Sequence, residues 1–202
     1  GLRKRSAESL PASAMGTDCL TRILDEDGKV LVVFKRLFCG HPEVHGKELV
    51  AYIEGLRFES TIVPNLEDSF SSMGDLACQL VAHLKAVNRG GDGGVQEGYA
   101  APVGGTFFLC SATEQDCGEF IYTVYPAPRP AGGGEAPLGV RVKMEAYYEE
   151  MRYRGGPVCA RMTLFDDDVG PDVQAFDLEA VRAARKAANT LIRKMTRKDT
   201  RG

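Results

Sequence analysis

The chain has 202 residues, of which 44% are hydrophobic and 26% charged, and a formal net charge of −3. These values are ordinary for a globular protein and exclude disorder of the whole chain. The longest apolar run, Val30 to Phe34, is strand-sized, whereas a bilayer span needs roughly 20 apolar residues. Residues 6–15 are too polar for the apolar core of a secretory signal. The sequence therefore predicts no membrane span and no visible signal peptide, and it leaves the compartment unassigned.

Residues 1–16 are expected to form a flexible basic arm, and residues 17–202 a single domain. The arm begins with three cations and continues with Ser, Ala and Pro, a composition typical of a mobile terminus.

Three stretches predict β-hairpins. In residues 19–38, Asp27-Gly28 separates two apolar runs, and the return run is apolar on both faces, as in a central strand. Residues 106–110 and 119–125 predict a second hairpin around a polar loop. Apolar and polar residues alternate over 140–149, which predicts a strand that turns at 155–156 into 158–165. Residues 47–63 are predicted to be extended, with Gly55 marking a bulge or bend.

Two stretches predict amphipathic helices. In 72–87, Ser72 and Asp75 resemble a capping box, and apolar residues recur at helical spacing. In 177–196, Asp177 is the expected N-cap, and an apolar stripe follows it. Hairpins interrupted by single helices predict an α+β fold, an antiparallel sheet packed by two amphipathic helices. A β-sandwich carrying the helices is the alternative.

Positive charge is concentrated at the two ends of the sequence. Residues 181–202 hold eight cations and one acid, a net +7, and the first 15 residues hold three cations and one acid, a net +2. The remainder must therefore carry −12, since the whole chain carries −3. The basic helix predicted over 177–196 is therefore either a solvated helix docked on the sheet or a binding site for an acidic partner. The cations expected to bind that partner are Arg3, Lys4, Arg5, Arg182, Arg185, Lys186, Arg193, Lys194, Arg197 and Lys198.

This charge pattern favours a non-enzymatic structural or interaction protein, a subunit of a larger oligomeric assembly with other protein subunits. Basic ends on a β-rich body are a layout common in coat and ribonucleoprotein subunits. RNA or DNA would be the largest reservoir of negative charge, contacted through phosphates without base recognition, because no RNA-recognition or zinc-finger motif is present. The apolar face of the helix lacks Trp and Phe, which disfavours a membrane surface. No cofactor is expected.

The alternative function is a small zinc-dependent or cysteine-based enzyme or module that uses Cys39, His41 and His45. A thiolate and two imidazoles are good zinc ligands, and the spacing lets one loop carry all three. No fourth ligand is evident nearby, and nothing in the spacing of the cysteines and histidines predicts a nucleophile held against a base.

The remaining motifs are weaker. Cys110 and Cys117 are the best disulfide candidates, because a hairpin could bring them together, and a secreted binding domain held by that bridge is a third possibility. Asp166, Asp167 and Asp168 carry the oxygen ligands of a hard cation but lack EF-hand spacing, so a solvated loop is expected there. The Gly-rich residues 89–94 do not form a P-loop, because no Gly-Lys-Ser/Thr follows.

Overall fold

The computed structural model describes residues 17–59, 68–87, 107–113, 119–128, 138–152, 156–171 and 176–199. The strands are β1 (Cys19–Leu24), β2 (Val30–Arg36), β3 (Arg57–Phe58), β4 (Ser69–Phe70), β5 (Phe107–Cys110), β6 (Phe120–Pro126), β7 (Val140–Arg152) and β8 (Gly156–Val169). The helices are the π-helical turn η2 (Pro42–Gly46), α1 (Lys47–Glu54), α2 (Met73–Val87) and α3 (Leu178–Asp199).

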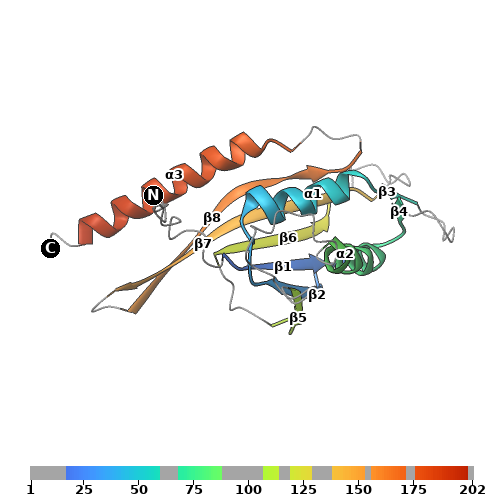
Figure 1. The fold of residues 1–202 in the computed structure, drawn as a ribbon, viewed down its shortest axis with the longest axis horizontal. Coiled ribbons are helices and arrows are strands. Elements are labelled where there is room, and N and C mark those ends of the chain that lie inside the picture. The colour runs from blue at the N-terminus through green and yellow to red at the C-terminus, as the bar shows by residue number, and fades with distance from the viewer. Residues whose placement is uncertain are drawn as a thin grey trace, which may run out of the picture.

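Six strands form one sheet in the order β5-β2-β1-β6-β7-β8, and β3 and β4 form a separate two-stranded ribbon (Figure 1). Within the large sheet only the central β1–β6 pair is parallel. A parallel pair needs a long crossover, which α1, α2 and β5 supply between the two strands. The predicted α+β class is therefore confirmed.

The first predicted hairpin is confirmed as β1 and β2. Gly28 has a φ of 78°, which favours glycine, and the Asp25 carboxylate accepts hydrogen bonds from the backbone N–H groups of Asp27 (3.0 Å) and Lys29 (2.7 Å). The expectation that β2 is buried on both faces is wrong at Leu31, whose side chain is 44% exposed. β2 lies next to the short edge strand β5, which pairs only with residues 33–36, so among the described strands the first residues of β2 have no neighbour on that side.

The second predicted hairpin is wrong. β5 pairs with β2, whereas β6 pairs with β1 and β7, so β1 and β2 separate the two strands. Both stretches are strands, as the aromatic content predicts, but adjacency along the chain does not make them partners. The hairpin argument for a Cys110–Cys117 bridge is lost with this pairing, and Cys117 lies outside the described residues.

The third predicted hairpin is confirmed as β7 and β8. Val140, Val142, Met144 and Ala146 are each at most 2% exposed, while the residues between them are partly exposed. Alternation with a period of two therefore places one face of β7 in the core.

The prediction that residues 47–63 are extended is wrong for 47–54, which form helix α1; Arg57 and Phe58 are extended in β3, and residues 60–63 lie outside the described residues. Leu49, Val50 and Ile53 recur at helical spacing and are at most 1% exposed. Gly55 is the C-cap of this helix, not a bulge within a strand.

Both predicted helices are confirmed, and both begin at the expected cap. The Ser72 hydroxyl accepts the backbone N–H of Asp75 at 3.1 Å, and the Asp75 carboxylate accepts that of Ser71 at 3.0 Å. At the start of α3 the Asp177 carboxylate accepts the N–H groups of Glu179 (2.9 Å) and Ala180 (3.0 Å).

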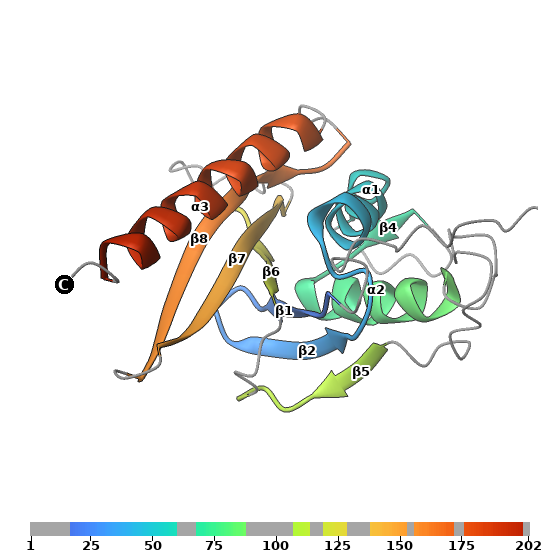
Figure 2. The same ribbon diagram turned by 60° about the vertical axis from the view of Figure 1, so that its left-hand side comes forward.

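All three α-helices cover the same face of the sheet, and α3 lies along β8 (Figures 1 and 2). The main core lies between them and contains apolar residues of all three α-helices and of all six strands. A smaller cluster of Leu20, Val33 and Ile121 lies on the opposite face. The second half of α3 and the far ends of β7 and β8 extend in one direction beyond the other strands (Figure 1).

Candidate functional site

The segment from Cys39 to Glu48 connects β2 to α1, and its backbone is tightly constrained. Cys39 has a φ of 58°, a region that non-glycine residues rarely adopt. At Gly40 a Cβ atom would lie 2.8 Å from backbone atoms of Asp18 and Cys19, so only glycine fits. The Tyr122 hydroxyl donates to the Gly40 carbonyl at 2.7 Å, which fastens the segment to β6.

Four polar side chains, two from this segment and two from β1 and β2, form a largely buried network, which we call the buried quartet: Thr21, Arg36, His45 and Glu48. Arg36 Nη1 donates to His45 Nδ1 (3.2 Å) and to Glu48 Oε2 (2.8 Å). Because a guanidinium only donates, His45 Nδ1 must accept, so the ring proton is on Nε2 and is donated to Thr21 Oγ1 at 2.8 Å. The Arg36 guanidinium also lies 5.0 Å from the ring centroid of Phe107.

His45 is a neutral structural imidazole in this environment. It is fully buried, and burial together with the Arg36 charge lowers its pKa to about 3. Cys19, also fully buried, has a raised pKa for the same principal reason, burial, and so stays a thiol. Neither group is accessible to a substrate in solution, and the quartet joins η2 and α1 to β1 and β2.

A second polar cluster surrounds the carboxylate of Glu43, which we call the Glu43 cluster. His41 Nδ1 lies 3.1 Å from Glu43 Oε2. Arg185 Nη1 of α3 lies 3.2 Å from the same oxygen, and Arg182 Nε lies 3.9 Å from Glu43 Oε1. Arg185 also packs its guanidinium 5.0 Å from the ring centroid of Phe120.

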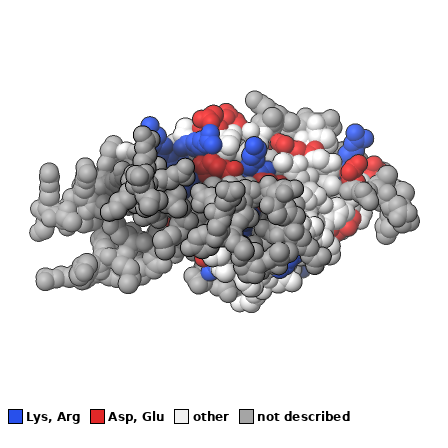
Figure 3. All heavy atoms as spheres, viewed as in Figure 1, with Lys and Arg blue, Asp and Glu red and all other residues white. Residues whose placement is uncertain are grey.

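Electrostatics favour the ionised form of Glu43. Partial burial alone would raise the pKa of its carboxyl group, but its own backbone N–H, the Arg185 charge and the His41 hydrogen bond together lower the pKa. A carboxylate therefore holds the first half of α3 against η2. Figure 3 shows cations and acids side by side along this part of the helix.

The cations predicted to bind an acidic partner fall into four groups. Arg182 and Arg185 contact Glu43, and Arg182 also pairs with Glu179 one turn earlier. Lys186 is exposed. The positions 193, 194, 197 and 198 lie in the second half of α3, and residues 3–5 lie outside the described residues.

The structure does not bring Cys39, His41 and His45 to one point. Cys39 is exposed, His41 faces Glu43, and His45 lies in the core against Thr21 and Arg36. Within the described ranges no three His, Cys, Asp or Glu side chains are grouped as a metal site would require. The predicted zinc module thus has no assembled ligand set in the described part of the chain.

The aspartates 166–168 lie in strand β8, not in the solvated loop that we expected. Asp166 accepts a hydrogen bond from the Tyr125 hydroxyl at 2.5 Å, and Arg141 forms ion pairs with Asp166 and Asp168, each at 3.4 Å. Burial, followed by the contact with Asp166, raises the pKa of Tyr125 to about 12. These carboxylates serve as partners for a tyrosine and an arginine of the neighbouring strands.

Sequence reasoning missed the residues that organise both clusters. Arg36 offered a signal, because it follows Phe34 by two residues and therefore falls on the same, buried face of β2. Glu43 offered none, because its partners on α3 are about 140 residues away in the sequence.

Comparison with models of protein families, with curated proteins and with solved structures found no match. None of the described helices is long and apolar enough to cross a membrane. The fold and the two clusters define a class in structural terms: an α+β domain whose last helix is basic and packs on the body through small apolar side chains and through the Glu43 carboxylate.

Proposed function

We propose that this chain is a non-enzymatic subunit of a larger coat-like or ribonucleoprotein-like assembly. In this proposal α3 contacts the phosphates of RNA or DNA. The observation that supports it most is the division of α3 into a first half that contacts Glu43 and a second half that extends, with the far ends of β7 and β8, beyond the other strands (Figure 1). Arg182 and Arg185 serve the docking, whereas Lys186 is exposed and four further cations follow in the extending half.

The spacing of these cations fits a polyanion. Positions 186, 193 and 197 are seven and four residues apart, which places them on one side of the helix. Eleven residues of helix span about 16 Å, a length over which a nucleic-acid strand presents several phosphates. The remainder of the chain is acidic overall, so a polyanion would be attracted to α3 in preference to the body.

Salt dependence of binding tests this proposal. A labelled 20-nucleotide single-stranded RNA and a 20-base-pair DNA duplex are titrated with the full chain between 50 and 200 mM salt. Four phosphate contacts predict that affinity falls about 50-fold for the single strand and about 150-fold for the duplex over this range. Polyglutamate of matched charge is the control.

Three outcomes would count against the proposal. They are an affinity that does not change with salt, an absence of binding at 50 mM salt, and tighter binding of polyglutamate than of either nucleic acid. The last of these would indicate that α3 binds an acidic protein and not a nucleic acid. The native mass of the chain, measured with and without RNA, tests the assembly part separately, since the proposal predicts an oligomer.

A further inference from the structure

In the Glu43 cluster, a carboxylate of the body pairs with two cations of α3, the helix that we propose as the phosphate-binding element. Glu43 approaches Arg185 at 3.2 Å and Arg182 at 3.9 Å, and the Glu179 carboxylate pairs with Arg182 from the other side. The first half of α3 thus has three cations, of which two already have an acidic partner within the chain.

These contacts are accessible to solvent. The side chains of Arg182 and Arg185 are 48% and 31% exposed, and that of Glu43 is 22% exposed. Ion pairs with this exposure contribute little net stability, so the charge of Glu43 can be removed at small cost to the fold, and a phosphate can then take the place of the carboxylate beside the two arginines. The apolar side chains that hold this part of α3 on the body are small: Val181, Ala184 and Ala188.

We propose that Glu43 is an intramolecular substitute for the acidic partner: it masks Arg182 and Arg185 from phosphate, so that the wild-type chain binds through the second half of α3. This inference rests on the proposed function and adds its regulation. The interface extends toward Phe120 only when the charge of Glu43 is removed and the two arginines are able to bind phosphate.

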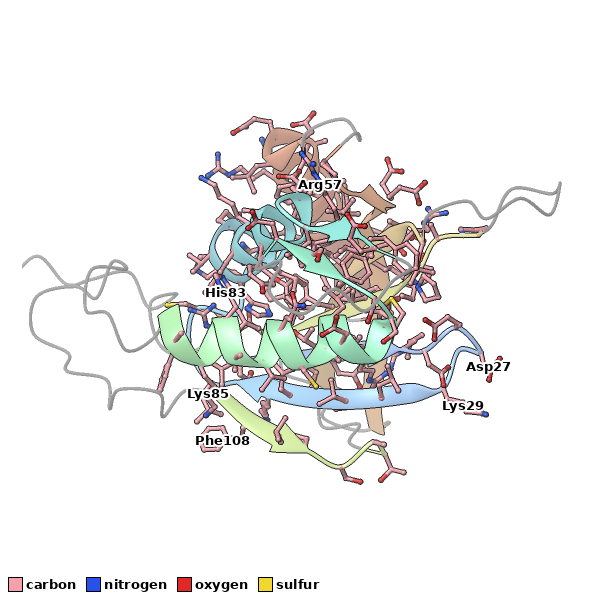
Figure 4. All side chains as sticks on the ribbon, turned by 90° about the vertical axis from the view of Figure 1, so that its right-hand side faces the viewer. Asp27, Lys29, Arg57, His83, Lys85 and Phe108 are labelled. Atoms are coloured by element: carbon pink, nitrogen blue, oxygen red, sulfur yellow. The ribbon has the colours of Figure 1, made fainter. Side chains whose placement is uncertain are left out.

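The test compares the salt dependence of RNA binding in three full-length proteins: the wild type, Glu43→Gln and Asp27→Asn. Glu43→Gln removes the masking charge and keeps a side chain of the same shape. Asp27→Asn is the control: it removes the same unit of charge at the β1–β2 turn, where Asp27 forms an exposed ion pair with Lys29 (Figure 4).

We expect Glu43→Gln to bind the single-stranded RNA about 3- to 10-fold more tightly at 50 mM salt, because two exposed ion pairs no longer compete. The slope of log affinity against log salt should steepen by about 0.7 for each arginine that gains a phosphate. Asp27→Asn should keep the wild-type slope.

Glu179→Gln is a second variant that does not depend on the docking contact. The Glu179 side chain is 79% exposed and pairs with Arg182. Loss of its charge should therefore steepen the slope of log affinity against log salt by about 0.7, the contribution of one arginine, without affecting folding. Equal slopes for all four proteins, with the wild type binding RNA, would overturn the masking by Glu43 and leave the proposed function intact. Absence of wild-type binding would overturn the proposed function itself.

Discussion

Arg36→Ala is expected to destabilise the folded chain by about 3–5 kcal/mol, because it removes one partner of a buried ion pair. Arg36 is 8% exposed and reaches Glu48 at 2.8 Å, His45 at 3.2 Å and the Phe107 ring. Without the guanidinium, the Glu48 carboxylate is left partly buried with no cation, and His45 Nδ1 loses its donor. Urea unfolding followed by circular dichroism measures the loss.

Two further proteins make this result specific to the quartet. Lys35→Ala changes the neighbouring cation on the other face of β2, which pairs with Asp18 at 3.1 Å, and should cost less than about 1 kcal/mol. The double variant Arg36→Met with Glu48→Leu replaces both charges by apolar side chains and should recover most of the lost stability. A cost below about 1 kcal/mol for Arg36→Ala would show that the quartet does not hold η2 to the sheet.

Acidification is expected to destabilise the fold through His45. Its pKa is about 3 in the folded state, against about 6.5 in an unfolded chain. The unfolded state therefore binds a proton between these values that the folded state does not. The stabilisation is complete above pH 6.5 and is lost as the pH falls toward 3. This single group predicts a loss of about 2 kcal/mol between pH 7.5 and pH 5.

The measurement is the free energy of unfolding at several pH values in the wild type and in His45→Gln. Glutamine cannot titrate, so the slope of about 1.4 kcal/mol per pH unit below pH 6 should be missing from His45→Gln and should appear in the difference between the two proteins. The absolute stability of His45→Gln will be lower at every pH, and only the slope is diagnostic. Parallel pH curves for the two proteins would show that folding does not lower the pKa of His45, which would contradict this prediction.

Much of the fold could be predicted because its signals are local. The Asp27-Gly28 turn, the alternation in β7 and the caps at Ser72 and Asp177 each act over a few residues. Helix α1 was missed because eight residues carry too little periodicity and Gly55 resembled a strand bulge.

The remaining errors concern contacts between distant segments. The partners of β5 and β6 follow from a crossover that brings β6 beside β1, which no local pattern reveals. The burial of His45 follows from the same assembly, so a side chain that resembled a zinc ligand is a core residue. The charge of α3 was visible in the sequence, whereas its division by Glu43 was not.

The central claim is that the second half of α3 supplies the contacts to a polyanion. The most direct test replaces Arg193, Lys194, Arg197 and Lys198 by glutamine and measures RNA affinity against salt. The control replaces four cations of the body by glutamine: Lys29, Lys47, Arg57 and Lys143. We predict that the helix variant loses nearly all of the salt-dependent affinity and that the body variant keeps the wild-type slope. Equal slopes in the helix variant and the wild type would contradict the account.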